Sequence, residues 1–174
     1  MKHVISVLVE NKFGVLSRIS GLFSARGFNI DSLAVGETDD PSVSRMTIVV
    51  EGDERTLEQV KKQLNKLIDI IKVQDFTDKK FIDRELILIK VSATPKNRNE
   101  VITLVESVGA EVVNVSSKSI TIEETGDPAK IKALFEVLRP FGIREVVRTG
   151  RIAIGTEQEF VLDNKSEKEN KKGE

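Results

Sequence analysis

Cysteine, tryptophan and tyrosine are absent from this chain of 174 residues, and histidine occurs once, at His3. Without cysteine the protein has no disulfide bond, no thiolate nucleophile and no cysteine-based metal site. His3 opens an apolar run and has no cluster of carboxylates near it in sequence. Metal binding and general-base catalysis both need several converging groups. We therefore predict neither a metal site nor a catalytic residue in this chain.

Long hydrophobic runs and an excess of charge of one sign are also missing. No apolar run approaches the roughly 20 residues that a membrane-spanning helix needs, and the first residues lack the basic region and cleavage site of a signal peptide. The 27 Lys and Arg residues nearly balance the 28 Asp and Glu residues, so the overall charge does not indicate a nucleic-acid partner. We expect a soluble, cytoplasmic protein with an aliphatic core.

The first part of the chain alternates β-branched runs with amphipathic helical patterns in the order βαββαβ. Turn-forming residues at 38–42 separate the second and third apolar runs. Gly27 is expected to end the first helix, and Asp53 to cap the second. The expected strands are 3–10, 29–36, 43–51 and 70–76, and the expected helices are 15–26 and 54–67.

A charged linker at 77–80 leads into a second set of elements in the same order. The expected strands are 85–93, 111–116, 118–124 and 143–148, resuming at 151–154, and the expected helices are 98–108 and 129–138, with Pro128 at the first position of the latter. Two βαββαβ units are typical of two ferredoxin-like domains. We therefore predict an α+β protein with domains at 1–77 and 78–156. Residues 157–174 are expected to form a charged, disordered tail.

Enzymatic and RNA-binding functions find no support in the motifs. The chain lacks a Gly-x-Ser-x-Gly elbow, a phosphate-binding loop and any other catalytic constellation, which argues against a small ferredoxin-fold hydrolase of the acylphosphatase kind. Asp39 and Asp40 precede Pro41 and are interpreted as turn residues rather than metal ligands. RNA-recognition motifs share the βαββαβ order but bind through aromatics on two central strands. The corresponding runs, 4–9 and 43–50, contain no aromatic residue.

The transition from the first strand to the first helix suggests a binding site for a small anion. The strand pattern stops at Asn11, the chain turns at Gly14, and apolar residues then recur at helical spacing. The first N–H groups of a helix have no partner within it and carry partial positive charge, so this turn can hold a carboxylate. Ordinary turn chemistry explains Asn11, Gly14 and Asn29 as well, if each is taken alone.

Strand order adds a reason to connect these residues. The usual order in a ferredoxin-like sheet is 4-1-3-2, which places the second strand at an edge with unpaired backbone groups. Pairing with the same edge of a second copy about a two-fold axis would place Asn29 of one chain near the turn at 11–14 of the other. A pocket between two chains would then couple ligand binding to the geometry of the dimer.

At these residues the chain closely resembles the regulatory (small) subunits of acetohydroxyacid synthase, also called acetolactate synthase. Their N-terminal part is an ACT domain, and the resemblance extends nearly without interruption to about residue 154. The run at 38–48 is distinctive of this family rather than of ACT domains in general. The matching segments are 6–11, 14–18, 21–30, 32–33, 38–42, 44–48, 63–69, 84–91 and 148–150.

The resemblance implies that the chain is a non-catalytic subunit in branched-chain amino-acid biosynthesis. Its partner would be a catalytic large subunit that uses thiamine diphosphate, Mg²⁺ and FAD, with no cofactor in this chain. The small subunit would stimulate that partner and confer feedback inhibition by valine. The alternative is a free-standing, amino-acid-binding ACT protein that regulates another partner.

The resemblance also implies a role for particular residues of this sequence in an effector site between two ACT domains. The backbone at Gly14, Val15 and Leu16 would receive the carboxylate of the amino acid. Its ammonium group would be met by Asn11 and by Asn29 of the second chain, and its side chain by apolar residues. The full expected set is Asn11, Gly14, Val15, Leu16, Asn29, Ile30 and Val35.

Overall fold

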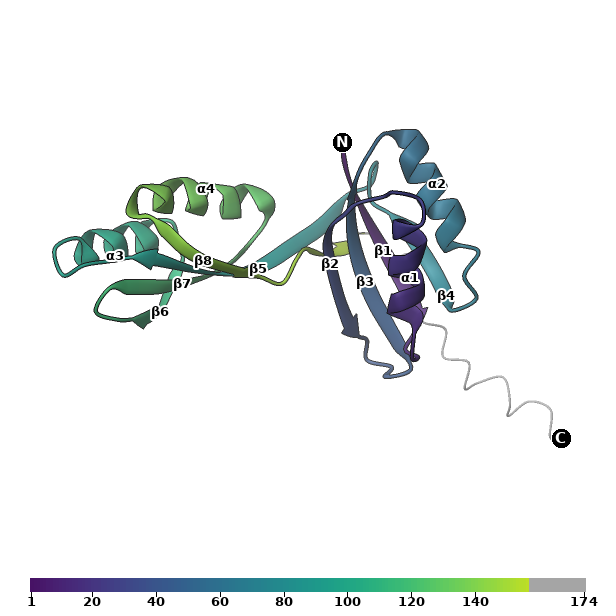
Figure 1. The fold of residues 1–174 in the computed structure, drawn as a ribbon, viewed down its shortest axis with the longest axis horizontal. Helices are drawn as coiled ribbons and strands as arrows, with labels where there is room; N and C mark the ends of the chain where they lie inside the picture. Colours follow the sequence, from purple (N-terminus) through teal and green to yellow (C-terminus); the bar gives the residue numbers. More distant parts are fainter. Residues whose placement is uncertain (157–174) are drawn as a thin grey trace.

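The computed structural model describes residues 1–156, which form two units of helices packed on a sheet, joined by one long strand (Figure 1). Each unit has the order βαββαβ, so the predicted α+β class with two ferredoxin-like units is confirmed. The predicted tail at 157–174 lies outside the described residues, and the exact domain limits remain a prediction. No helix within residues 1–156 is long and apolar enough to cross a bilayer.

The first unit is a four-stranded antiparallel sheet with two helices on one face (Figure 1). Its strand order is β2-β3-β1-β4, which confirms the predicted order and places β2 at an edge. Gly14 and Asp53 precede the two helices, and Asp53 accepts a hydrogen bond from the Thr56 N–H as an N-cap. The elements are β1 (Lys2–Glu10), α1 (Val15–Ser24), β2 (Ile30–Glu37), β3 (Val43–Glu51), α2 (Glu54–Leu64) and β4 (Ile70–Asp75).

The second unit repeats this arrangement with the strand order β6-β7-β5-β8. Pro128 occupies the first turn of α4, and Asp127 caps it by accepting from the Lys130 N–H. The elements are β5 (Phe81–Ser92), α3 (Arg98–Ser107), β6 (Glu111–Val115), β7 (Ser119–Gly126), α4 (Pro128–Leu138), a 3₁₀ turn at Arg139–Phe141, β8 (Ile143–Arg148) and β9 (Ile152–Gly155).

Both helices of the first unit end earlier than the sequence predicts, and β5 begins earlier. After Leu64 the chain continues in tighter turns, since the Leu67 N–H donates to the Leu64 carbonyl. Leu67 therefore still packs against the core, as its helical spacing predicted, although it lies beyond the α-helix. Strand β5 begins at Phe81 because its first residues pair with β9, which follows about seventy residues later. This long-range partner is invisible to local pattern analysis.

Three apolar clusters hold the structure together. The first lies between the sheet and helices of the first unit, and the second lies in the equivalent position of the second unit. The third cluster lies on the opposite face of the first sheet, where the ribbon formed by β5 and β9 contributes Phe81 and Ala153. There Phe81 stacks on Phe76 with ring centroids 5.0 Å apart. The first sheet is therefore covered by helices on one face and, in part, by the ribbon on the other.

Because the first two clusters share no residue, core truncations in the two units should act independently. Leu64 and Leu134 are almost completely buried, one in each cluster. We expect Leu64→Ala and Leu134→Ala each to destabilise its own unit by about 2–5 kcal/mol. In the double variant the free energy of unfolding of each unit should fall by the same amount as in the corresponding single variant, to within about 0.5 kcal/mol. Native-state hydrogen exchange in urea measures both units at once, and a strongly non-additive result would contradict two separate cores.

Candidate functional site

The turn between β1 and α1 leaves backbone N–H groups open at the start of the helix. Gly14 is the N-cap residue, with φ of 82°, and no side chain caps the helix. The Val15 N–H is used inside the turn, where it donates to the Lys12 carbonyl at 3.3 Å. Within the described residues, the N–H groups of Leu16 and Ser17 remain available to an anion, because the first N–H groups of a helix have no intrahelical acceptor.

A basic side chain that sequence analysis did not assign to the site lies against this turn. Arg18 Nε and Nη2 lie 2.9 and 2.8 Å from Asp69 Oδ2, and Asp69 also accepts from the Glu10 N–H through its carbonyl. A Cβ added to Gly14 would lie 3.1 Å from Arg18 Nη1. The guanidinium group thus lies beside the helix N-terminus as half of an ion pair with Asp69, and Nη1 is its nitrogen nearest to Gly14. The signal in the sequence is the spacing, since Arg18 follows Gly14 by one helical turn.

Asn11 connects the turn to the far end of β2. Its Nδ2 donates to Glu37 Oε1 at 3.0 Å and to the Pro41 carbonyl at 2.9 Å, and its backbone N–H donates to the Ser42 carbonyl at 2.7 Å. With both amide hydrogens engaged, the group that Asn11 offers to a ligand is its carbonyl oxygen Oδ1. Glu37 adds a carboxylate at the same place, which sequence analysis missed.

Asn29 lies at the opposite end of β2 from this turn. It directly precedes the strand, and its Nδ2 donates to Asp31 Oδ1 at 2.8 Å. Lys2 Nζ lies 2.9 Å from the other carboxylate oxygen, and this hydrogen bond lowers the pKa of Asp31. From Asn29 to Glu37 the strand spans eight steps, roughly 26 Å at about 3.3 Å per residue. A single chain therefore does not bring Asn29 and Asn11 together.

Ile30 and Val35, the two residues expected to contact the side chain of the ligand, are separated in the same way. Ile30 opens β2 and packs, half-buried, against the first core cluster. Val35 lies near the end of the strand, and 47% of its surface is exposed. Within residues 1–156, β2 pairs with β3 alone, so its outer edge offers backbone groups without a partner.

Phe13, in the turn itself, is a further exposed apolar residue, and sequence analysis gave it no role. Its side chain is fully exposed at 103%, although aromatic residues make up only 5% of the chain. Its signal in the sequence was an aromatic residue inside an otherwise polar turn.

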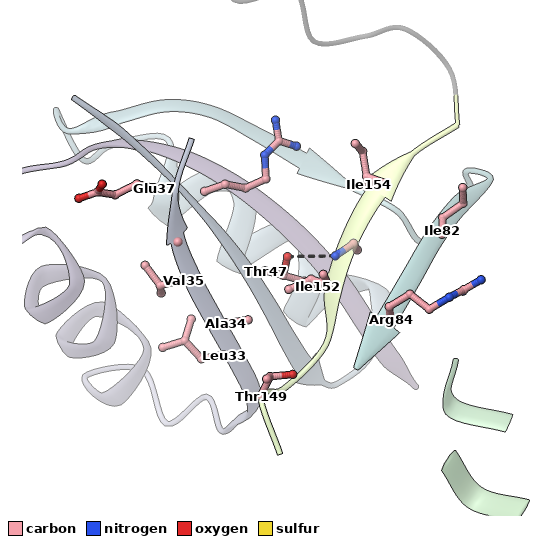
Figure 2. Close-up of a pocket in the computed structure, with 13 residues that line it drawn as sticks. Leu33, Ala34, Val35, Glu37, Thr47, Ile82, Arg84, Thr149, Ile152 and Ile154 are labelled. Carbon is pink, nitrogen blue, oxygen red and sulfur yellow. Dashed lines mark hydrogen bonds between the residues drawn. The ribbon is translucent and has the colours of Figure 1, made fainter. Parts of the chain in front are cut away.

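A groove of about 700 Å³ opens on the face of the first sheet that lies opposite the helices, between β2 and the ribbon (Figure 2). The ribbon contributes the exposed side chains of Ile82, Ile152 and Ile154, and Arg84 lies on its rim (Figure 2). Asn11, Gly14 and Asn29 do not line this groove. Sequence analysis could not find it, because the groove exists only where β9 crosses the sheet.

The remaining residues that sequence analysis considered have structural roles. The buried His3 has Nδ1 3.0 Å from Thr77 Oγ1 and Nε2 3.1 Å from the Gly52 carbonyl. Asp40 accepts from the N–H and hydroxyl of Ser42, which lower its pKa and shape the turn. Across residues 1–156, no three His, Cys, Asp or Glu side chains gather closely enough to hold a metal ion.

Comparisons with known proteins match both units. Residues 5–72 match the family model of the AHAS (acetohydroxyacid synthase) small subunit-like ACT domain. Residues 84–157 match the model of the small subunit of acetolactate synthase.

Whole-chain relatives carry the same description. A probable acetolactate synthase small subunit of Archaeoglobus fulgidus is 53% identical over 154 residues, covering 88% of this chain and 96% of that protein. The acetolactate synthase small subunit of Mycolicibacterium smegmatis is 52% identical over 152 residues, covering 87% of this chain and 89% of that protein. The crystal structure of the acetolactate synthase small subunit from Thermotoga maritima superimposes with a TM-score of 0.81 at 37% identity, covering 90% of this chain and 98% of that one.

Replacement by alanine should have opposite effects on stability at two nearby glycines, Gly14 in the turn and Gly21 in α1. Gly14→Ala should destabilise the fold by about 1–2 kcal/mol, because the residue must keep a left-handed conformation with a Cβ close to Arg18. Gly21→Ala is the matched control: Gly21 is exposed inside α1 with no atom near the added Cβ, so it should stabilise by up to about 1 kcal/mol. Urea unfolding of both variants would show opposite signs. Equal effects would contradict the strained turn.

Proposed function

The chain belongs to the acetolactate synthase small-subunit family, and we propose that it stimulates a thiamine-diphosphate-dependent catalytic subunit and makes that subunit sensitive to valine. It is the non-catalytic, regulatory type of subunit, with an ACT domain at its N-terminus. The match of the second unit to the same family, and not to a separate one, favours this function over a free-standing ACT protein. We place the complex in the cytoplasm, as part of branched-chain amino-acid biosynthesis.

One observation carries the proposed effector site: its two halves lie at opposite ends of the edge strand β2, roughly 26 Å apart. An unpaired strand edge invites pairing with another chain. Antiparallel pairing of β2 with β2 of a second copy, about a two-fold axis, joins the start of one strand to the end of the other. Asn29 of the second copy then lies near Asn11 and Gly14 of the first, and the two sheets become one of eight strands.

The groups at this junction complement an amino-acid zwitterion. The helix N-terminus supplies partial positive charge for the carboxylate through the N–H groups of Leu16 and Ser17. Arg18, although paired with Asp69, adds Nη1 as a further donor. Acceptors lie on the other side, where Asn11 Oδ1 and the Glu37 carboxylate can receive the ammonium hydrogens.

The aliphatic part of the ligand would rest between chains. Pairing of the two strands brings Ile30 of the second copy towards Val35 of the first. Both chains therefore contribute residues to the apolar surface that contacts the ligand. Valine inhibits only if it binds the inhibited arrangement of the complex more tightly than the active one. A coupling of about 1–3 kcal/mol is ordinary, and the catalytic subunit must then change valine affinity by the same factor.

Substitutions at each half of the site should remove the valine response. In Gly14→Asp a carboxylate repels the carboxylate of valine, and in Asn29→His the amide is replaced by a bulkier ring. We expect calorimetric valine binding to weaken at least tenfold, about 1.4 kcal/mol, while stimulation of the catalytic subunit stays within about twofold of the wild type. Asn114→His, on the exposed β6, is the control for the histidine substitution. Full valine sensitivity in either site variant would show that the pocket is assigned wrongly.

Mixing the two site variants tests whether the site is shared. A mixed dimer of Gly14→Asp and Asn29→His has one doubly altered site and one with both wild-type halves. After unfolding and refolding together at equal concentration, about half of the dimers are mixed, and about a quarter of all sites should bind valine normally. If the site lay within one chain, mixing would restore no binding.

A further inference from the structure

Two chain crossings connect the first unit to the second, and they form one ribbon. Residues Phe81–Arg84 at the start of β5 pair with β9 in an antiparallel ladder that ends at Ile152. The rest of β5 lies in the second sheet, between β7 and β8. A conformational change in the first sheet therefore reaches the second unit either along this ribbon or through side chains of the first unit that contact the second unit directly (Figure 1).

The ribbon contacts the first sheet through backbone N–H groups that donate to hydroxyls. The Arg151 N–H donates to Ser32 Oγ on β2 at 3.0 Å. The Ala153 N–H donates to Thr47 Oγ1 on β3 at 3.2 Å, shown as the dashed line in Figure 2. These two bonds hold the ribbon to the edge strand and to its neighbour.

The chain packs closely at Gly150, next to the first of these bonds. Gly150 has φ of 79°, and a Cβ placed on it would lie only 2.7 Å from Ser32 Oγ and 3.3 Å from the Leu33 carbonyl. A distance of 2.7 Å is below van der Waals contact, so a side chain fits here only if the Ser32 hydroxyl rotates away from the Arg151 N–H or if β2 or the ribbon shifts. The position of β2 and that of the ribbon are consequently coupled.

Ser32 is the point of β2 at which its pairing is irregular. The register against β3 shifts between Ile30 and Ser32, which leaves Asp31 as an extra residue in a bulge. Asn29 and Ile30, on the far side of this bulge, belong to the proposed effector site. A bulge is a place where a strand bends, and Ser32, which accepts the hydrogen bond from Arg151, directly follows it.

On its other side the contact is tied firmly to the second unit. The Thr149 N–H donates to the Leu86 carbonyl at 3.1 Å, and the Leu86 N–H donates to Thr149 Oγ1 at 3.2 Å. Arg151 Nε lies 2.8 Å from Asp83 Oδ2, and Arg148 Nε lies 2.8 Å from the buried Glu85. A displacement of Gly150 therefore carries the base of the second sheet with it.

We propose that the contact of Gly150 and Arg151 with Ser32 is the joint that transmits effector binding from β2 to the second unit. The inference rests on the proposed function, and it adds the path of regulation from the same site. In this scheme the effector closes the start of β2 against a second copy, the bulge shifts Ser32, and the ribbon turns the second unit. Breaking the joint leaves the effector bound but without consequence for the catalytic subunit.

The test separates binding from inhibition in the full chain. Gly150→Ala forces the joint open, and Ser32→Ala removes the acceptor of the Arg151 N–H. We expect calorimetric valine affinity within about threefold of the wild type for both. In the complex reconstituted with the catalytic subunit, the inhibition reached at saturating valine should be largely lost in Gly150→Ala. The loss in Ser32→Ala should be smaller, and stimulation without valine should be unchanged.

The control for backbone strain is Gly109→Ala. Gly109 also has a left-handed φ, of 74°, but a Cβ there meets only the end of Lys130, at 4.0 Å. It should keep normal inhibition. A second readout needs no catalytic subunit: valine should slow hydrogen exchange at the Arg151 amide in the wild type but not in Ser32→Ala.

The possible outcomes are distinct. Normal inhibition in both joint variants would overturn the proposal, and so would loss of valine binding in step with inhibition, since the contact would then be part of the pocket. Ser32→Ala adds no atom, so it keeps the test decisive if Gly150→Ala fails to fold. If the wild-type chain binds no valine, alone or in the complex, the proposed function itself fails, and the joint loses its premise.

Discussion

A strand at the edge of a sheet can satisfy its backbone hydrogen bonds on one side only, and β2 is placed under this constraint by the order β2-β3-β1-β4. Its two ends carry different chemistry: Asn29 begins it, and Glu37, the hydrogen-bond partner of Asn11, ends it. A strand of this length keeps those ends too far apart for one small ligand. The proposed antiparallel copy of β2 would supply both a partner for the free edge and the second half of the ligand site.

The second unit is bound to the same strand by a different device. Strand β5 runs through both the ribbon and the second sheet, so the two units share a backbone ladder although their cores share no residue. The ribbon buries Ala153 and Phe81 on the face of the first sheet that the helices leave uncovered. Since it covers only part of that face, a groove remains between it and β2. The edge strand β2 consequently borders the groove and carries the proposed dimer edge, the proposed effector residue Ile30 and the proposed joint at Ser32.

Sequence reasoning succeeded where structure is determined locally. The alternation of apolar residues predicted every element of the first unit to within a few residues, and Asp53 and Pro128 marked helix starts by capping chemistry. It failed where distant segments meet. The early start of β5 depends on pairing with β9. The position of Arg18 beside Gly14 depends on Asp69, which directly precedes β4, and the groove depends on where the ribbon crosses the sheet. Within the site, sequence reasoning joined Asn11 and Asn29 only through a second copy of the chain. A single chain holds them at opposite ends of β2, so their meeting stays a prediction.

A site with halves on two chains links ligand binding to assembly. A ligand that binds only the paired form stabilises that form by RT ln(1 + [L]/Kd) for each site, so valine at a hundred times its Kd contributes about 2.7 kcal/mol per site to pairing. By the same linkage, pairing that is already enforced by a catalytic subunit raises the apparent valine affinity, since the cost of bringing two β2 edges together has been met. An effector site inside one chain has no such dependence. In the proposed site, the separation of Asn29 from Asn11 by a full strand makes valine affinity depend on the assembled complex rather than on the isolated chain.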